Sequence, residues 1–243
     1  MKSLVHLFCL IIICFTVSCS KKEPLSSVED IYKTKNETQE VYYQKLALLL
    51  GKELTNYKIS DINIENLIKL FSNHLEKYEV DGSLSDDAFV LASVEEALEA
   101  LKDGEFGIGA ALVKDGKIIL RAHNSQLSNK RSDLHAEMTL INMFENHPEL
   151  EKHRDLFNID EDIVLYSSTE PCPMCLTRIA ICELASKYGA SSDLDGMAHL
   201  IKHLPESWKN LAQKNVPSEA IASDELKALA HLMFYSFLFM DFS

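Results

Sequence analysis

His135-Ala136-Glu137 and Glu170-Pro171-Cys172-Pro173-Met174-Cys175 are the two short runs that indicate the fold class of this chain. They supply one imidazole and two thiols, which are ligands that a tetrahedral zinc ion prefers in proteins. A Cys-x-x-Cys pair at a helix start lies about one turn apart, so both sulfurs can face one ion. His135, Cys172 and Cys175 therefore form a candidate zinc site with one position left for water, and Glu137 is left free to move protons.

Each run has other interpretations when it is taken alone. A Cys-x-x-Cys pair can be a disulfide or a redox pair, and a glutamate such as Glu137 is favourable in the first turn of any exposed helix. A disulfide between Cys172 and Cys175 is the main alternative, because the N-terminus indicates export to an oxidising compartment. Cys182, on the apolar side of the next predicted helix, is expected to be a buried core residue.

The two runs in this order resemble the H-x-E and P-C-x-x-C signature of the zinc-dependent nucleobase and nucleoside deaminases. The resemblance implies an α/β protein with the cytidine-deaminase-like fold, a three-layer α/β/α arrangement around a mixed five-stranded sheet. It implies Zn²⁺ as cofactor, His135, Cys172 and Cys175 as metal ligands, and Glu137 as the catalytic proton carrier. The Glu170-Pro171 form of the second run places the chain nearer the guanine deaminase and tRNA adenosine deaminase branch than the cytidine deaminases.

The same resemblance implies a set of substrate contacts. Asn124 matches an asparagine that hydrogen-bonds the base, and Phe106 and Ile108 fall where the family packs apolar groups against the ring. Asp193 is a candidate for a polar contact, and the backbone N–H of Cys172 for an oxyanion-type donor. Each side chain has a structural alternative, which is a turn for Asn124, a loop cap for Asp193 and core packing for the two apolar residues.

Apolar periodicity predicts the elements that carry these residues. Asp61 and Asp133 are expected helix N-caps, the second for the helix that carries His135 and continues through Phe144. Asp115-Gly116 is expected to be a two-residue hairpin turn. The other predicted helices cover residues 36–53, 61–80, 85–102, 173–184, 199–212 and 223–237, and the predicted strands cover residues 107–114, 117–122, 162–168, 186–190 and 216–222.

The N-terminus resembles a bacterial lipoprotein signal. Lys2 precedes an apolar run over residues 4–17 that is shorter than the roughly 20 residues needed to span a bilayer, and the small Ser18 precedes Cys19. We expect residues 1–18 to be a signal peptide, Cys19 to be lipidated and residues 19–35 to be a polar tether. An uncleaved anchor and an ordinary cleaved signal are the alternatives. Residues 36–80 would be a helical extension and residues 81–243 the zinc deaminase domain, exported and anchored to the periplasmic or surface face of a membrane.

The formal net charge of −13 opposes binding to a phosphate backbone, so tRNA is not the expected substrate. We expect hydrolytic deamination of a small nucleobase or nucleoside, with a guanine-like purine favoured, by attack of zinc-activated hydroxide and release of ammonia. The alternatives are a cytidine-type or nucleic-acid-type deaminase and a non-catalytic zinc-binding lipoprotein. Glu137 argues against the last, because a structural zinc site needs no spare base. The apolar stripe of the extension is expected to pack on the domain or on a partner subunit, which leaves a homodimer open.

Overall fold

The computed structural model describes residues 25–33, 37–51, 53–54, 62–155, 158–159, 162–191, 196–213 and 215–239. Its main feature is a five-stranded sheet with the strand order β2-β1-β5-β6-β7. Strand β1 pairs antiparallel with its neighbours β2 and β5, whereas β5 pairs parallel with β6 and β6 pairs parallel with β7. The predicted mixed sheet is confirmed, with strands β1 (Gly109–Lys114), β2 (Lys117–His123), β5 (Ile163–Thr169), β6 (Ala185–Ala190) and β7 (Ser218–Glu219).

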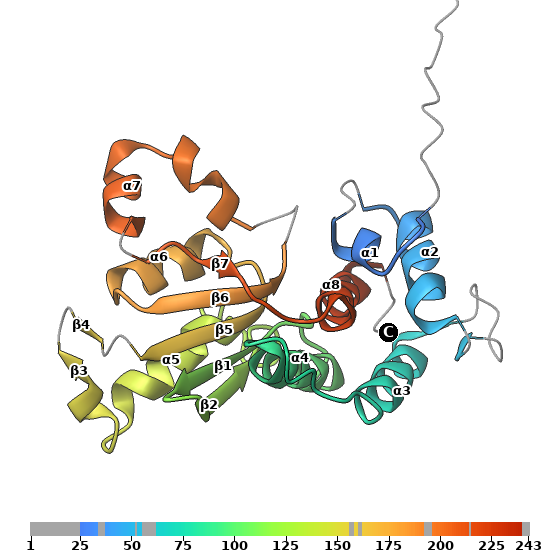
Figure 1. The fold of residues 1–243 in the computed structure, drawn as a ribbon, viewed down its shortest axis with the longest axis horizontal. Coiled ribbons are helices and arrows are strands. Elements are labelled where there is room, and N and C mark those ends of the chain that lie inside the picture. The colour runs from blue at the N-terminus through green and yellow to red at the C-terminus, as the bar shows by residue number, and fades with distance from the viewer. Residues whose placement is uncertain are drawn as a thin grey trace, which may run out of the picture.

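Helices cover both faces of this sheet, which gives the predicted three layers (Figure 1). One face carries α4 (Asp87–Lys102) and α8 (Asp224–Phe239), and the other carries α5 (Ala136–Asn146) and α6 (Pro173–Ile181). Helix α4 lies so close to β1 that a Cβ atom at Gly109 would come within 2.3 Å of the Ser93 carbonyl oxygen and 2.4 Å of the Ala97 nitrogen. A glycine is therefore required at this strand position, because any side chain would push the helix off the sheet.

The turn between β1 and β2 follows the sequence prediction. Asp115 has φ of 50° and Gly116 has φ of 70°, and two successive residues in the left-handed region suit the twist of an antiparallel hairpin. Glycine adopts this conformation without a Cβ penalty, and aspartate tolerates it better than most residues. The conformation of this turn thus depends on residues that are adjacent in the sequence. The hairpin pairs Gly109 with His123 at the end of the strands away from the turn.

The N-terminal helices α1 (Glu29–Lys33), α2 (Gln39–Leu50) and α3 (Ile64–Leu75) pack against α8 and α4 rather than standing apart (Figure 1). The Tyr42 hydroxyl donates to the Leu232 carbonyl at 3.2 Å, and Tyr32 donates to Asp224 at 2.6 Å. Ile31 and Tyr32 are buried, so residues 25–33 differ from the polar tether expected for residues 19–35. Helix α1, which carries these two side chains, packs against α8. The predicted signal peptide and Cys19 lie outside the described residues.

Of the two predicted N-caps, Asp133 is wrong and Asp61 lies outside the described residues. Asp133 does not cap α5, because its carboxylate is held by Arg131 through two hydrogen bonds, at 3.1 and 2.6 Å. The N-cap residue of α5 is His135. Helix α3 begins at Ile64 with Asn63 as its N-cap, whose side chain accepts from the Asn66 N–H at 2.9 Å. Asp61, the predicted cap, lies outside the described residues.

Three further boundaries differ from the predictions. Helix α6 ends at Ile181, because Glu183 takes a left-handed φ of 54° that stops the helix before Leu184. The single helix predicted for residues 199–212 is interrupted at Pro205, which has no N–H to donate to the preceding turn. It forms the 3-10 helix η4 (Ala198–His203) and the helix α7 (Glu206–Ala212). Strand β7 is two residues long, and the small hairpin of β3 (Arg154–Asp155) and β4 (Asn158–Ile159) was not predicted.

Helix length bears on membrane insertion. The helices α4 and α8 have 16 residues each, whereas a bilayer span needs about 20. Within the described ranges, no helix has the length and apolar character of a membrane span.

Candidate active site

The predicted metal ligands meet at the carboxyl end of β5. Cys172 is the N-cap residue of α6, Cys175 lies in its first turn, and His135 is the N-cap residue of α5. Nδ1 of His135 lies 3.6 Å from Sγ of Cys172 and 3.7 Å from Sγ of Cys175, and the three ligand atoms lie within 4.8 Å of one another. A tetrahedral zinc ion with ordinary Zn–N and Zn–S bonds separates such atoms by about 3.6 Å. The spacing and the donor types therefore fit zinc.

The two thiols carry unequal charge in this arrangement. The pKa of Cys172 is lowered to about 4, chiefly by a hydrogen bond from Cys175. Burial opposes this change, and a hydrogen bond with His135 adds to it. Donation to Cys172, followed by burial, raises the pKa of Cys175. Cys172 is thus a ready thiolate, and Cys175 would release its proton when a metal binds. Neither cysteine is in a disulfide, and the same holds for Cys182, the remaining cysteine of the described residues, which is buried as predicted.

Glu137 lies beside the three ligands without being needed as a fourth. Its Oε2 accepts from the Cys175 thiol at 3.3 Å and its Oε1 accepts from the Ser167 hydroxyl at 3.1 Å. The side chain is 2% exposed. Burial, followed by the negative charge of Cys172, raises the pKa of Glu137 above that of an ordinary carboxyl group. A carboxyl group with a raised pKa is suited to accept and return a proton near neutral pH.

Asn124 connects the sheet to α5, the helix that begins at the candidate ligand His135 and is called the metal helix below. Its Oδ1 accepts from the Ala136 N–H at 2.7 Å, and this bond satisfies a free donor at the start of α5. Its backbone N–H donates to the Ile108 carbonyl at 3.1 Å. Within the described part of the chain, Nδ2 has no acceptor, and a carbonyl oxygen keeps a second lone pair. Asn124 therefore has a structural role that the sequence did not reveal, and its amide still has a donor for a ligand.

Ile108 is hydrogen-bonded to the backbone of this asparagine, and both apolar candidates are also part of the core or packed against it. Ile108 is buried, and the ring of Phe106 lies 3.9 Å from that of Phe237 in α8, measured between centroids. Helix α8 approaches this segment closely, since a Cβ atom on Gly107 would lie 2.5 Å from the Met233 carbonyl oxygen. The roles of Phe106 and Ile108 as substrate contacts stay predictions, and core packing accounts for much of their burial.

Two further candidates stay predictions, for different reasons. Asp193 lies outside the described residues, so its predicted substrate contact stays a prediction. The backbone N–H of Cys172 has no acceptor among the residues that the structure describes. It precedes the first turn of α6, where N–H groups are without partners in the helix. It is therefore placed as an oxyanion-type donor would be, although that role also stays a prediction.

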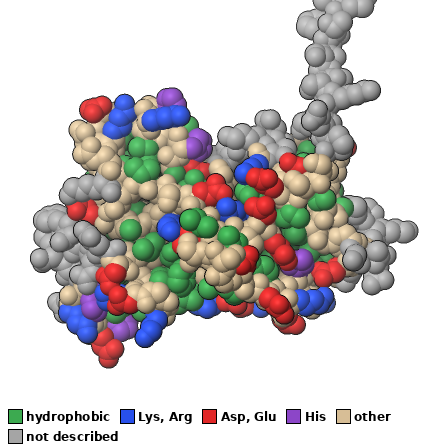
Figure 2. All heavy atoms as spheres, viewed as in Figure 1, with side chains coloured by type: hydrophobic (Ala, Val, Ile, Leu, Met, Phe, Trp, Pro, Cys, Tyr) green, Lys and Arg blue, Asp and Glu red, His purple; other side chains and the backbone are tan. Residues whose placement is uncertain are grey.

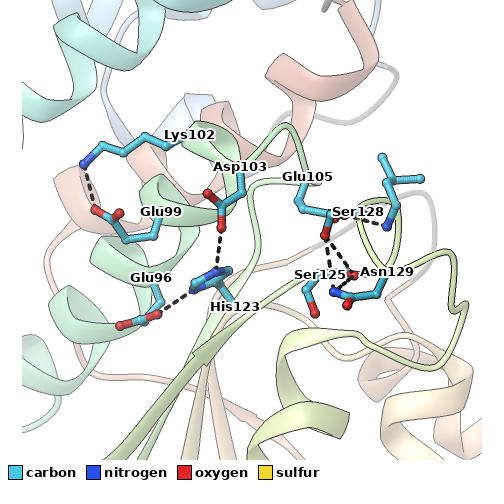
Figure 3. Close-up of polar contacts among 10 residues, drawn as sticks. Glu96, Glu99, Lys102, Asp103, Glu105, His123, Ser125, Ser128 and Asn129 are labelled. Atoms are coloured by element: carbon cyan, nitrogen blue, oxygen red, sulfur yellow. Dashed lines mark hydrogen bonds and ion pairs between the residues drawn. The ribbon is translucent and has the colours of Figure 1, made fainter.

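Sequence reasoning did not identify Ser167 and Glu105 as parts of this site. Ser167 lies on β5 and its only signal was its polarity within a predicted buried strand. Glu105 is 0% exposed, and its carboxylate accepts from the N–H groups of Leu127 and Ser128 at 2.9 and 2.7 Å (Figure 3). These bonds hold the loop that joins Asn124 to the metal helix.

His123, for which the sequence offered no role, is an electrostatic link between β2 and α4. Its Nδ1 lies 2.9 Å from Glu96 and its Nε2 lies 3.3 Å from Asp103 (Figure 3). The hydrogen bond with Glu96 is the largest cause of the raised pKa of His123. Burial acts in the opposite direction and is smaller. The residue stabilises the strand end from which Asn124 continues.

Comparison with known proteins agrees with this site. Residues 84–189 match the family described as the cytidine and deoxycytidylate deaminase zinc-binding region. The chain is 31% identical over 140 residues to the tRNA-specific adenosine deaminase of Bacillus subtilis, covering 57% of this chain and 83% of the relative. It is 34% identical over 111 residues to the tRNA-specific adenosine deaminase of a Streptococcus pyogenes strain, covering 45% of this chain and 65% of the relative.

A solved structure of guanine deaminase from Bacillus subtilis is 33% identical and has a TM-score of 0.37, covering 43% of this chain and 63% of that chain. His135, Cys172 and Cys175 form a centre that could hold a metal ion, and Glu137 lies next to it. The chain belongs to the zinc-binding family of nucleobase and nucleoside deaminases. Zn²⁺ is the cofactor that this centre binds.

Proposed function

We propose that this protein is a zinc-dependent hydrolytic deaminase of a small nucleobase or nucleoside, with a guanine-like purine as the favoured substrate. The observation that carries the proposal is the position of Glu137, a buried carboxyl group 3.3 Å from the Cys175 sulfur and outside the ligand set. A purely structural metal site gives no reason to bury an extra carboxyl group beside it, because a buried charge is costly without a partner.

The residues of the site would divide the work as follows. His135, Cys172 and Cys175 would hold zinc, which supplies a water molecule whose pKa is lowered to about 7. Glu137 would take one proton from the attacking water and deliver it to a ring nitrogen. It would then take the remaining proton of the added hydroxyl group and deliver it to the departing amino group, which leaves as ammonia. Ser167 would hold Oε1 of Glu137 in place, so that Oε2 stays directed towards the metal side. Nδ2 of Asn124 would donate to an acceptor on the base.

Charge supports a small substrate rather than a polynucleotide. The formal net charge is −13, and acidic side chains gather across the middle of one face, where basic ones are scattered singly (Figure 2). Proteins that bind nucleic acids gain much of their affinity from basic residues that release counterions. A free base carries no phosphate and is not repelled by this surface. The Glu170-Pro171 pair before Cys172 supports a purine over a cytidine-type substrate.

An ammonia-release assay on the zinc-loaded protein tests this proposal. The panel would contain guanine, adenine, cytosine, guanosine, adenosine and cytidine at equal concentrations. We expect ammonia from at least one purine, and none from that purine with Glu137→Ala. Zinc-loaded protein that releases ammonia from none of the six would remove the small-substrate proposal.

A second candidate is deamination of adenosine in tRNA. It is favoured by the 31% identity to a relative named as a tRNA-specific adenosine deaminase, of which the chain covers 83%. Formation of inosine in total tRNA, measured by nucleoside mass spectrometry, would distinguish it from the small-substrate proposal. Inosine in tRNA together with no ammonia from free bases would favour this candidate.

We further propose that the protein is exported and anchored to a bacterial membrane through a lipid on Cys19. The support is the short apolar run over residues 4–17 followed by Ser18 and Cys19. Full-length protein expressed in a bacterium should partition into the detergent phase and carry acyl groups by mass spectrometry. Cys19→Ser should remain in the aqueous phase, and equal partitioning of the two proteins would contradict the proposal. Partner exchange or light scattering would decide whether a homodimer forms.

A further inference from the structure

Glu170 is a buried carboxylate next to the metal ligands that the proposed reaction does not use. It lies two residues before Cys172, and its side chain is 0% exposed. A buried carboxylate needs strong hydrogen-bond donors to offset the loss of water. Its donors therefore show what this residue holds.

The donors come from the segment that follows β6. Oε1 of Glu170 accepts from the backbone N–H of His199 at 3.1 Å and lies 2.8 Å from its Nδ1, and Oε2 accepts from the Ser191 hydroxyl at 2.8 Å. One carboxylate thus holds a residue that directly follows β6 and a residue of the 3-10 helix η4. Charge-assisted bonds of this kind are shorter and stronger than neutral ones.

Backbone bonds join the same two segments. The N–H of Glu170 donates to the Ala190 carbonyl at 2.8 Å, and the N–H of Met197 donates to the Pro171 carbonyl at 3.0 Å. The start of η4 is therefore placed against the turn that carries Cys172. This turn lies at the carboxyl ends of the parallel strands β5 and β6, where Thr169 pairs with Ala190. Ligands of open α/β sheets bind at this edge.

The ring of His199 has one nitrogen inside this arrangement and one outside it. Nδ1 faces the buried carboxylate, whereas the side chain as a whole is 41% exposed. A neutral imidazole that donates from Nδ1 presents an acceptor lone pair at Nε2. Glu170 therefore determines the ring orientation of a histidine next to the metal-binding turn, and for the neutral ring it selects the tautomer with the proton on Nδ1.

We propose that His199 is a specificity-determining residue, whose Nε2 accepts a hydrogen bond from an N–H group of the bound base, and that Glu170 is its positioning residue. This inference rests on the proposed function and names the part of the base that is recognised. The favoured ligand is an aminated heterocycle with a second donor, a ring N–H or amino group, besides the amino group that leaves. A base without a second donor gains nothing from His199.

Kinetics with matched variants test this inference. His199→Ala should raise KM for the preferred base about tenfold, the effect of one lost hydrogen bond, with kcat within about threefold. It should also reduce the preference for that base over one that lacks the second donor. His203→Ala, an exposed histidine on the same 3-10 helix, should change neither. Unchanged KM and unchanged preference in His199→Ala would overturn the proposal.

The role of Glu170 is tested by its coupling to His199. Glu170→Gln should raise KM as His199→Ala does, and the double variant should be no worse than either single variant, because both changes remove the same contact. Multiplying effects would overturn the positioning role. Zinc content and circular dichroism identify a variant that has lost its metal or its fold. Glu170→Asp, which keeps the charge but shortens the reach towards His199, then takes the place of Glu170→Gln and should raise KM in the same way.

A binding measurement separates this inference from the proposed function. Zinc-loaded Glu137→Ala protein, which should bind a base without converting it, is titrated calorimetrically with guanine and with adenine, with and without His199→Ala. Weaker binding in the His199→Ala background supports the role of His199 even if the wild type releases no ammonia. Equal binding in both backgrounds overturns it even if the wild type is an active deaminase. Binding of neither base in either background would overturn it together with the purine preference.

Discussion

The Ser167 hydroxyl donates to Oε1 of Glu137 at 3.1 Å, and this bond links the central strand β5 to the first turn of α5. The other oxygen of the carboxylate lies 3.3 Å from the Cys175 sulfur. The proton carrier of the proposed reaction is therefore held from the sheet through Oε1, while Oε2 faces the candidate metal ligands. Each side of this arrangement can be changed separately.

Removal of the carboxylate should abolish turnover and spare the metal. We expect Glu137→Gln to lower kcat by a factor of about 10² to 10⁴, the usual contribution of a positioned acid or base. Zinc content, measured by mass spectrometry, should equal that of the wild type, because Glu137 is not a ligand. Glu149→Gln, an exposed carboxylate just beyond the end of α5, is the control and should be fully active. Loss of zinc in Glu137→Gln would show that the residue is a ligand instead.

Removal of the supporting hydroxyl should have a smaller effect. Ser167→Ala deletes one hydrogen bond to a carboxylate, and such bonds contribute about 1.5 to 3 kcal/mol. We expect kcat to fall by roughly ten- to a hundredfold, with KM and zinc content unchanged. Ser167→Thr, which keeps the hydroxyl, should retain more activity than the alanine variant. Equal kcat values for alanine and wild type would mean that Glu137 does not depend on this bond.

The three cysteines of the described residues should behave differently towards metal. Cys172→Ser and Cys175→Ser should each lower bound zinc to well below one equivalent and abolish activity, since thiolates are the softer and stronger zinc ligands. Cys182→Ser should retain zinc, because Cys182 lies at the end of α6 and its sulfur is 3.5 Å from Glu145 instead. Removal of the metal by a chelator and its return should restore activity in the wild type. Zinc loss in Cys182→Ser and not in the other two would reverse the ligand assignment.

His123 should make stability depend on pH. The hydrogen bond with Glu96 outweighs the effect of burial and raises the pKa of His123 above its ordinary value of 6.5. A histidine with a raised pKa in the folded state stabilises the fold fully below that ordinary value and loses this contribution as pH rises through the raised value. The melting temperature of wild type minus that of His123→Gln should be largest near pH 6 and shrink towards about pH 9. A difference that grows with pH would contradict the assignment.

The helical extension should be energetically part of the domain. Lys45 is fully buried and pairs with Glu37, and its Nζ lies 3.0 Å from Nε2 of His231 in α8. Removing one partner of a buried ion pair costs about 3 to 5 kcal/mol, so Lys45→Met should lower the free energy of unfolding by an amount in that range. Lys77→Met, which breaks an exposed pair with Glu53, should change it by less than about 1 kcal/mol. Chemical denaturation measures both, and equal losses would contradict the difference in burial.

Several features of this protein follow from residues that are close in sequence. The two-residue spacing in His135-Ala136-Glu137 and the three-residue spacing of Cys172 and Cys175 place chemical groups within one helical turn. The turn at Asp115-Gly116 depends on the conformations that these two residues tolerate. Local geometry decides such features, so the hairpin and the grouping of the candidate ligands could be predicted. The mixed sheet was implied by the resemblance of the two runs to the deaminase signature.

Other features depend on contacts between distant segments. The first turns of α5 and α6 meet only because the sheet brings together residues 37 positions apart. The same holds for Ser167 beside Glu137, and for His199 beside Glu170. Side-chain partners of this kind depend on the order and register of strands, which no short window of sequence contains.

The sequence by itself therefore determined the donor types of the candidate metal site and the hairpin turn, because spacing and turn conformation are local properties. The class of fold was implied by the resemblance of the two runs to the deaminase signature. The tertiary structure alone decided that Asn124 caps the metal helix, that Glu170 orients His199 and that the N-terminal helices pack on α8. The physical reason is that a buried polar or apolar group takes the partner that the packed sheet and helices bring within reach, and that partner lies far away along the chain.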